Sequence, residues 1–490
     1  MSTTVPAVPE FRFRNLGPIA EGTIQLRPLT ILIGKNNTGK TYTAQAIYAA
    51  YKALERANGP ATPPLTGDES FDLISWINHP AEPLGVETAA AFTGKFQTWL
   101  GTRLERASRN LADRLAIYFD IENLSELKRW RASGELDIAV HCRQSETESR
   151  ALFTLSGDHE HAPLDTLDIS SLRETRVVEL LDEFLAASSG GAAASRSELL
   201  QRRAASLLSD HLWYRHLLPA SGLGGDAHYL PAGRSGLLEA WTDVVRIRLE
   251  QDRDGLALTG REPAALGGIA LDFLIELQQL TSPRSERRAW QKPLRRPIRV
   301  APEIPSAATH LERLIGGGVV VARGRERVPS LSYQHGKQVI PVQRASSMVA
   351  ELAPLIRWIS DVLGPGDLLL IDEPEAHMHP EAVLAVAQTL VALSQAGVRV
   401  LCTTHSTDFL HQVSNCMLRA AQVPSSGSAD APSISVDDLA VYRFEQGEHE
   451  QGSTVSPVEV DPAWGIPEDE YVAVAERLAD ETAQLLGETR

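Results

Sequence analysis

A glycine-rich segment near the start of the chain has the residue types of a phosphate-binding loop. It runs from Gly34 to Thr41 as GKNNTGKT and fits the pattern G-x-x-x-x-G-K-[ST]. The glycines let successive backbone N–H groups point at phosphate oxygens, and Lys40 would neutralise β- and γ-phosphate charge. Thr41 would bind Mg²⁺, so the chemistry expected here is the binding of ATP with Mg²⁺. The expected ATP-binding residues of this loop are Gly34, Lys35, Asn36, Asn37, Thr38, Gly39, Lys40 and Thr41.

Two adjacent acids follow an apolar run far downstream in the chain. Leu368–Ile371 is a continuous apolar run, and Asp372 and Glu373 come directly after it. Neighbouring carboxylates repel each other unless a cation lies close by. We expect Asp372 to bind Mg²⁺ and Glu373 to act as the general base that polarises the attacking water. A solvated acidic turn is the alternative interpretation of this pair.

A histidine follows a third apolar run, Val398–Thr403. A histidine just past a buried strand can reach a γ-phosphate and sense its loss. We therefore place His405 with Glu373 and Lys40 as the expected catalytic residues. A purely structural histidine at the end of a strand is the alternative.

These motifs lie next to segments that have the patterns of regular structure. Leu29–Ile33, Asp367–Ile371 and Val398–Thr403 have the length and the apolar side chains of buried strands. Tyr42–Leu54 and Pro380–Ala396 have the spacing of helices. Strand, loop and helix in this order are what a phosphate site needs, and the alternation predicts an α/β fold.

A long stretch of chain separates Lys40 from Asp372. From about Gly59 to Ala227 it reads as mostly helical, most clearly at Asn123–Ala132, Ser170–Ala187 and Ser197–Leu218. We therefore expect one ATPase core in two halves with a helical insertion between them. The expected domains are residues 1–58, the N-terminal half of the core; residues 59–300, the insertion; and residues 301–490, the C-terminal half.

The composition predicts a soluble, cytoplasmic protein. The chain has 490 residues and a net charge of −16, and its three cysteines form no CxxC pair. A sparse, odd set of cysteines suits a reducing compartment and predicts no disulfide framework. No apolar run reaches the about 18 residues that a membrane helix needs, and the N-terminus lacks the apolar segment of a signal peptide.

One basic stretch contrasts with this acidic composition. Pro283–Val300 contains several arginines together with Trp290, which could bind DNA through its phosphates and by base stacking. A solvated charged face is the alternative, and the net negative charge argues against broad coating of DNA. DNA contact through residues 284–299 therefore stays open as a hypothesis.

Several segments together resemble the ABC-type AAA family of ATPases, which includes the OLD group and SMC-like heads and occurs in bacterial antiphage defence systems. The resemblance implies a P-loop NTPase fold, an ABC-type ATPase head with a large, mostly helical insertion between its Walker A and Walker B halves. It covers the start of the chain and its last third, and the middle matches weakly. The segments that carry it are Arg12–Asn15, Gly17–Ile19, Leu29–Thr41, Tyr229–Arg234, Ile371–Pro380 and Thr404–Ser406.

The resemblance also implies a signature segment that completes the ATP site of a partner chain. Its best match is Arg344–Leu352, in which Ser346 and Ser347 would contact the partner's γ-phosphate. Met348 stands where many ABC signatures have glycine, and a simple helix N-cap is the alternative. Arg234 lies in a glycine-rich turn and is interpreted as either close to the nucleotide or structural.

His377 and His379 fall in the segment that resembles the D-loop, which packs across an ATP-bound dimer in this family. A metal site is the alternative, because histidine and nearby carboxylates suit Zn²⁺ or Mn²⁺. We prefer the D-loop interpretation.

The function implied by the resemblance is an ATP-binding and ATP-hydrolysing module whose heads dimerise around ATP. A homodimer or higher oligomer would then regulate an effector in antiphage defence. The residues after His405 contain no convincing Glu…Asp-x-Asp set, so we expect no TOPRIM domain in this chain and a separate nuclease or TOPRIM-type effector. The alternative is a DNA-repair or chromosome-maintenance ATPase that clamps DNA, similar to SMC and RecF proteins. A transporter ATPase subunit ranks last.

Overall fold

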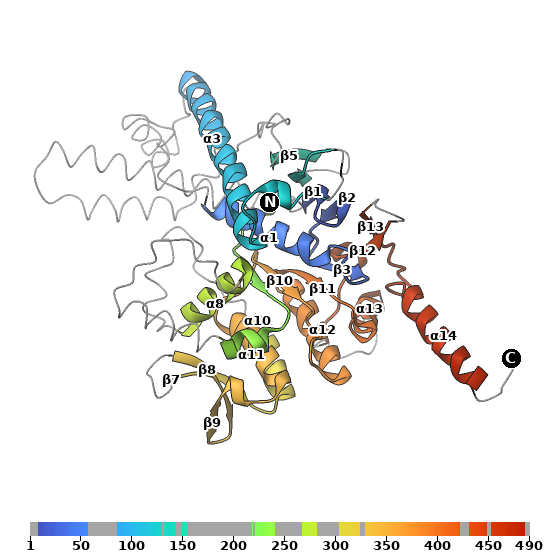
Figure 1. Ribbon diagram of the computed structural model, residues 1–490. Helices are drawn as coiled ribbons and strands as arrows, with labels where there is room; N and C mark the ends of the chain where they lie inside the picture. The colour runs from blue at the N-terminus through green and yellow to red at the C-terminus, as the bar shows by residue number, and fades with distance from the viewer. Residues whose placement is uncertain are drawn as a thin grey trace, which may run out of the picture. The chain divides into compact units, whose positions relative to one another are not determined.

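The chain divides into two compact units, each of which is described by itself. Unit 1 holds residues 1–16, 46–226 and 288–297, and unit 2 holds residues 17–45, 227–287 and 298–490. Figure 1 shows the computed structural model as a ribbon. It describes residues 8–56, 86–129, 132, 134–143, 149–154, 218, 221–240, 267–281, 303–323, 329–421, 431–447 and 452–485.

Unit 1 contains three antiparallel strands that lie side by side. β1 (Val8–Leu16) pairs with β4 (Asp137–Arg143), which pairs with β5 (Ser149–Thr154). The long helix α3 (Val86–Phe119) belongs to the same unit, and the 3-10 turn η1 (Leu124–Glu126) follows it.

Helix α1 (Lys40–Arg56) begins in unit 2 and ends in unit 1. Within unit 1, the buried rings of Tyr48 and Tyr118 stack with their centroids 5.3 Å apart. Aromatic burial of this kind fixes the end of α1 against α3.

The sheet of unit 2 has a parallel centre. Its strands β3 (Leu29–Gly34), β11 (Arg399–Thr403) and β10 (Leu368–Asp372) are adjacent and parallel, and nearly all of their residues are buried. Because parallel strands end at the same edge of a sheet, segments that follow these three strands lie close together. The full order in this unit is β2 (Ile19–Gln25), β13 (Ser453–Pro457), β12 (Leu439–Gln446), β3 (Leu29–Gly34), β11 (Arg399–Thr403), β10 (Leu368–Asp372) and β6 (Ala227–Leu230).

Five helices and this sheet together form the hydrophobic core of unit 2. The helices are α8 (Gly268–Thr281), α10 (Glu303–Leu314), α11 (Ser347–Asp361), α12 (Pro380–Gln395) and α13 (Thr407–Ala421). Trp358 on α11 is fully buried and stacks on Phe273 of α8, with ring centroids 5.6 Å apart. α12 and α13 lie beside β10 and β11 (Figure 1).

A small antiparallel sheet precedes α11. It consists of β7 (Gly318–Arg323), β8 (Pro329–His335) and β9 (Gln338–Pro341), and the 3-10 turn η4 (Val342–Arg344) links it to α11. The chain therefore reaches the start of α11 from a separate layer of structure.

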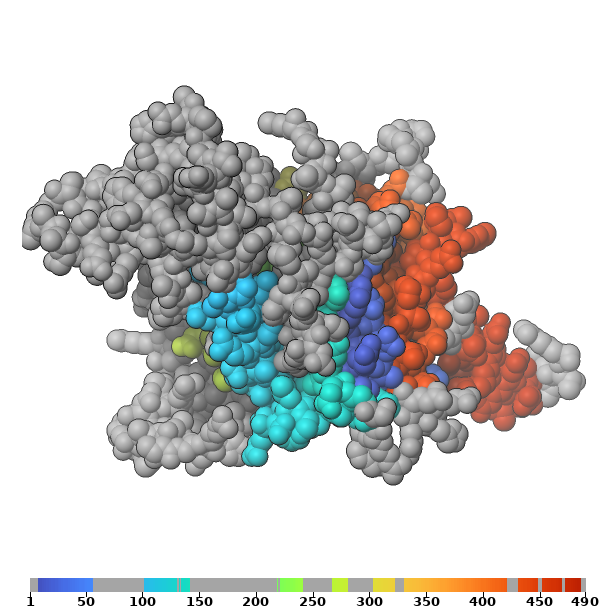
Figure 2. Space-filling model, turned by 90° about the horizontal axis from the view of Figure 1, so that it is seen from above, coloured from blue at the N-terminus to red at the C-terminus, as the bar shows by residue number. Residues whose placement is uncertain are grey.

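The last described helix, α14 (Asp469–Leu485), stands out from the surface of unit 2 (Figure 2). From Val472 onward its described side chains are exposed except for Ala483, which is half-buried. A 3-10 turn, η5 (Val436–Asp438), lies before β12. Among the described residues, no helix combines the length and apolar character that crossing a membrane requires.

The observed fold is that of an α/β P-loop NTPase with an ABC-type ATPase head, as expected. The expected helix at Asn123–Ala132 is wrong, because the described residues there form only the turn η1. β4 and β5 also interrupt the stretch that was expected to be mostly helical. The expected helices Ser170–Ala187 and Ser197–Leu218 lie outside the described residues, apart from position 218. The expected domain boundaries stay a prediction.

Candidate functional site

The phosphate-binding loop joins β3 to α1 in unit 2. Gly34, Asn37 and Gly39 adopt positive φ angles of 134°, 63° and 106°. Position 34 requires glycine, because an added Cβ would lie 2.3 Å from the carbonyl oxygen of Phe444. Thr38 donates from Oγ1 to the carbonyl oxygen of Lys35 at 2.8 Å, inside the loop. The loop therefore has the tight curl of a backbone phosphate cradle.

Lys40 is the first residue of α1, and its side chain folds back over the loop. Nζ donates hydrogen bonds to the carbonyl oxygens of Gly34 at 2.8 Å and Lys35 at 2.7 Å. Lys40 is only 6% exposed. Burial lowers the pKa of Lys40 to about 8, against the opposing effect of the carboxylates that follow β10. A bound phosphate would stabilise the charged ammonium in the same way as those carboxylates.

Asp372 is the last residue of β10 and is buried. Tyr229 donates its hydroxyl to Oδ2 at 2.5 Å, and Thr403 donates its hydroxyl to Oδ1 at 2.9 Å. Burial raises the pKa of Asp372, while both hydrogen bonds lower it. Both carboxylate oxygens are therefore held in fixed directions at the strand end.

The donor set at this end of the sheet fits Mg²⁺ bound with a nucleotide. Hydroxyl and carboxylate oxygens are its usual protein ligands. Asp372 supplies an oriented carboxylate, and Thr41 supplies an exposed hydroxyl residue in the first turn of α1. Buried Lys40 supplies the cation that a phosphate group needs.

Glu373 has an unusual backbone for a residue with a side chain. Its φ of 46° lies in the left-handed region, which most L-residues avoid. Its N–H donates to the carbonyl oxygen of Thr403 at 3.1 Å and to Thr403 Oγ1 at 3.2 Å. Thr403 thus contacts both acids of the pair and links the end of β11 to the end of β10.

Glu375 connects this acidic segment to His405. Its Oε1 accepts hydrogen bonds from Thr404 Oγ1 at 2.7 Å and from the N–H of His405 at 2.8 Å. Burial raises the pKa of Glu375, while these two hydrogen bonds lower it. Burial also lowers the pKa of His405, and the charge of Lys40 lowers it further while Glu373 opposes both. His405 is therefore within electrostatic reach of Lys40 and Glu373.

The structure brings the three sequence motifs to one edge of the unit 2 sheet. Asp372 on β10 lies opposite Thr403 on β11, and Thr403 lies opposite Leu32 on β3. The phosphate-binding loop comes at the end of β3, the acid pair at the end of β10, and His405 shortly after the end of β11. The residues assembled there are Gly34, Lys40, Asp372, Glu373 and His405.

Ser346 and Ser347 lie elsewhere, at the exposed start of α11. Ser346 is the N-cap residue, and its Oγ accepts the N–H of Val349 at 3.4 Å. Among the described residues, neither serine has a hydrogen bond to the phosphate-binding loop of its own chain. The structure therefore contains the N-cap that was the alternative interpretation, and it leaves both residues open to solvent.

Each histidine of the D-loop-like segment has a partner within the fold. His377 Nδ1 lies 3.2 Å from Glu351 Oε1. His379 is the N-cap of α12 and accepts the N–H of Glu381 at 3.4 Å. In the part of the chain that the structure describes, no group of three or more His, Cys, Asp or Glu side chains is arranged to hold a metal ion.

Several residues of this site were not predicted from the sequence. Tyr229 and Thr403 orient Asp372, and Glu375 holds the His405 segment. Arg234 is buried and donates to the carbonyl oxygens of both acids, which favours the structural interpretation of that residue. Tyr229, Arg234 and Glu375 carried a signal in the sequence, because they lie in the segments Tyr229–Arg234 and Ile371–Pro380 that carry the family resemblance. The basic stretch Pro283–Val300 lies outside the described residues.

A curled phosphate loop after a buried strand, together with acids and a histidine on neighbouring parallel strands, defines a P-loop ATPase of the ABC type.

Comparisons with known proteins agree with this class. Residues 175–410 match the family model described as "AAA domain, putative AbiEii toxin, Type IV TA system". The chain is 34% identical over 98 residues to the Old nuclease of Escherichia phage P2, covering 19% of this chain and 16% of that protein. It is 40% identical over 48 residues to the general L-amino acid transport ATP-binding protein AapP of Rhizobium johnstonii, covering 10% of this chain and 19% of that protein. The chain thus spans less than a fifth of either relative, and it contains an ABC-type AAA ATPase domain similar to that of OLD proteins.

Solved SMC heads are also similar. The Smc head bound to the C-winged helix domain of ScpA matches with a TM-score of 0.36 and 10% identity, covering 94% of this chain and 99% of that one. The SMC head domain from Thermotoga maritima matches with a TM-score of 0.30 and 10% identity, covering 92% and 99%. These similarities are weak, and the fold class rests on the strand order and the motifs.

Proposed function

We propose that unit 2 hydrolyses ATP at the edge where β3, β10 and β11 end. The observation that supports this most is the adjacent, parallel order of these strands, which gathers Lys40, Asp372, Glu373 and His405. Ordinary surface turns do not collect a buried lysine, a buried aspartate and a strained glutamate at one place.

Each residue has a role that follows from its contacts. The loop N–H groups of Gly34–Thr41 bind the phosphates, and Lys40 exchanges its two carbonyl partners for phosphate oxygens. Mg²⁺, when bound through Thr41 and Asp372, neutralises phosphate charge. Glu373 accepts the proton of the attacking water. His405 contacts the γ-phosphate, held there through Glu375.

Two substitutions test this site. We expect Lys40→Ala to lose ATP binding and turnover, because the cation of the cradle is removed. We expect Glu373→Gln to keep ATP binding but to lower kcat by about 100-fold or more, since a general base contributes roughly that much. Lys337→Ala and Glu476→Gln change exposed residues on the β8–β9 turn and on α14, and they are the matched controls. Wild-type turnover in both site variants would overturn the assignment.

We also propose that two chains associate around ATP. The start of α11 exposes Ser346 and Ser347 together with free helical N–H groups, which is a suitable contact for a partner's γ-phosphate. These exposed groups support the ATP-bound dimer implied by the resemblance, in which each chain completes the ATP site of the other.

Light scattering on the Glu373→Gln variant tests the association. ATP should convert this variant from monomer to dimer, because ATP is bound and not consumed. Adding Ser347→Asp should keep it monomeric, since a carboxylate would face the phosphate, while Ser456→Asp on exposed β13 should not. A monomer with and without ATP would contradict the proposal.

We further propose that this cycle regulates a separate effector of the nuclease or TOPRIM type in antiphage defence. The support is the family model described with an AbiEii toxin and the match to the Old nuclease of a phage. Cells that express the chain with its neighbouring genes should plate phage less efficiently than cells with Lys40→Ala or Glu373→Gln. Equal plating on all three would argue against a defence role.

A further inference from the structure

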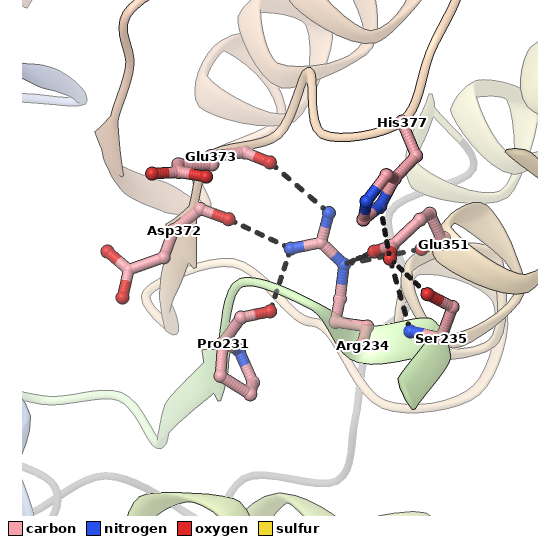
Figure 3. Close-up of polar contacts among 7 residues, drawn as sticks. All are labelled: Pro231, Arg234, Ser235, Glu351, Asp372, Glu373 and His377. Carbon is pink, nitrogen blue, oxygen red and sulfur yellow. Dashed lines mark hydrogen bonds and ion pairs between the residues drawn. The ribbon is translucent and has the colours of Figure 1, made fainter. Parts of the chain in front are cut away.

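Arg234 is a buried cation directly behind the acid pair. It is 1% exposed, at the start of the helical segment that follows β6, and its guanidinium faces the peptide groups of Asp372 and Glu373 at the end of β10. Figure 3 shows this guanidinium between the carboxylate of Glu351 and the backbone of Asp372 and Glu373. A charge is seldom buried at this depth without specific partners.

The hydrogen bonds of Arg234 go to backbone carbonyl groups. Nη1 donates to the carbonyl oxygens of Pro231 at 3.0 Å and Asp372 at 2.9 Å, and Nη2 donates to that of Glu373 at 3.4 Å. Nε lies 3.1 Å from Glu351 Oε2. The planar guanidinium can reach these groups at once, which the single ammonium of a lysine cannot do.

We propose that the pair Arg234–Glu351 is a positioning device for the general base Glu373, an inference that rests on the proposed function. Glu373 has the left-handed φ of 46°, and such a backbone persists only where its surroundings hold it. Thr403 binds the N–H of Glu373, and Arg234 binds its carbonyl oxygen. The peptide groups on both sides of the Glu373 Cα are therefore held, which sets the direction of its side chain.

Glu351 connects this device to two further segments. It is fully buried on α11, and its Oε1 accepts the N–H of Ser235 at 3.1 Å and the Ser235 hydroxyl at 2.7 Å. The same oxygen lies 3.2 Å from Nδ1 of His377, whose side chain is 58% exposed. The start of α11 and the segment after the acid pair are thereby tied to the position of Arg234.

The first test compares turnover with binding. Arg234→Lys keeps the positive charge but loses the planar guanidinium with its several N–H donors. We expect it to lower kcat by about tenfold or more, with ATP affinity changed by less than about threefold. Arg419→Lys is the matched control. Arg419 lies on α13 and also donates a hydrogen bond to a backbone carbonyl oxygen, that of Pro432. Equal losses of ATP affinity and kcat, or wild-type kcat in Arg234→Lys, would overturn the proposal.

The second test asks whether Arg234 acts through Glu373. In a Glu373→Gln background, Arg234→Lys should lower the residual kcat no further, because the group that it positions is already absent. A further loss of the same size would show a general structural effect and overturn the proposal. If Glu373→Gln itself retains wild-type turnover, the proposed function fails, whereas an inactive Glu373→Gln with an unaffected Arg234→Lys refutes this inference alone.

A milder variant serves if Arg234→Lys does not fold, as judged by thermal unfolding. Ser235→Ala removes only the hydroxyl that donates to Glu351 Oε1. It should lower kcat by about threefold or more without a matching loss of ATP affinity, since one of the contacts that hold Glu351 is gone. Unchanged kcat in a folded Ser235→Ala variant would count against the proposal.

Discussion

The backbone N–H of His405 donates a hydrogen bond to Oε1 of Glu375 across 2.8 Å. Thr404 donates its hydroxyl to the same oxygen at 2.7 Å. One carboxylate after β10 thus holds the segment that follows β11. The histidine motif is therefore positioned by a residue from the acidic motif as well as by its own strand.

This contact predicts different outcomes for two substitutions of Glu375. Glu375→Ala removes the acceptor of both hydrogen bonds, and we expect kcat to fall by about tenfold or more because His405 is displaced. Glu375→Gln keeps an acceptor oxygen and should retain most of the activity. Steady-state kcat and KM, with thermal unfolding as the check on folding, measure both. Wild-type kcat in Glu375→Ala would show that His405 needs no such support.

The hydrogen bond from Tyr229 to Asp372 predicts a change in the Mg²⁺ requirement. Tyr229→Phe removes the donor that orients Oδ2, so we expect the Mg²⁺ concentration for half-maximal ATPase activity to rise by roughly tenfold. Tyr333→Phe is the control, because its hydroxyl donates to the carbonyl oxygen of Ile315, away from the site. Identical Mg²⁺ titrations for both variants would contradict the prediction.

Lys40 predicts a pH dependence of ATP affinity. Burial lowers the pKa of Lys40 to about 8 without nucleotide, and bound phosphates would raise that pKa. Above this pH, ATP binding is coupled to the uptake of a proton by Lys40. The affinity for ATP is therefore highest below about pH 8 and falls as the pH rises. We expect Kd to increase by up to about tenfold per pH unit above that point. Calorimetric titrations of the wild-type chain across the range measure this change, and a Kd that does not vary with pH would contradict the prediction.

The same pKa predicts how the stability of the nucleotide-free chain varies with pH. The pKa of Lys40 is about 8 in the folded state, below the ordinary 10.5 of an unfolded lysine. Between these values the unfolded chain binds more protons, so the free energy of unfolding should increase as the pH rises. Denaturant unfolding of wild type and Lys40→Met tests this, and parallel curves for the two would contradict it.

Two glycines predict opposite effects of the same substitution. Gly34→Ala should destabilise the chain by about 2 kcal/mol or more, because the φ of 134° and the Phe444 carbonyl oxygen both oppose a Cβ. Gly101 lies within helix α3 with open space around it, so Gly101→Ala should stabilise by about 0.5–1 kcal/mol. Denaturant unfolding measures both changes, and ATP binding should be lost only in Gly34→Ala.

Local sequence patterns predicted the parts of the site that lie next to regular elements. The loop from Gly34 to Thr41, the acid pair and His405 each follow a predicted strand. The strands and helices predicted next to them formed within a few residues of their expected ends, whereas the helix predicted at Asn123–Ala132 did not form. Apolar runs and helical spacing are local signals, because burial of one face depends on neighbouring residues in the sequence.

The sequence alone determined which residues are predicted to carry the chemistry, since a phosphate cradle and an acidic strand end need particular residue types at short spacing. Only the tertiary structure decided what holds them in place. The partners Tyr229, Arg234 and Glu351 come from distant segments that no local pattern joins to Asp372 and Glu373. Their contacts exist because β6, β10 and α11 pack together. Packing pairs residues by position in space, and a buried charge or hydroxyl finds its partner only after those elements have met.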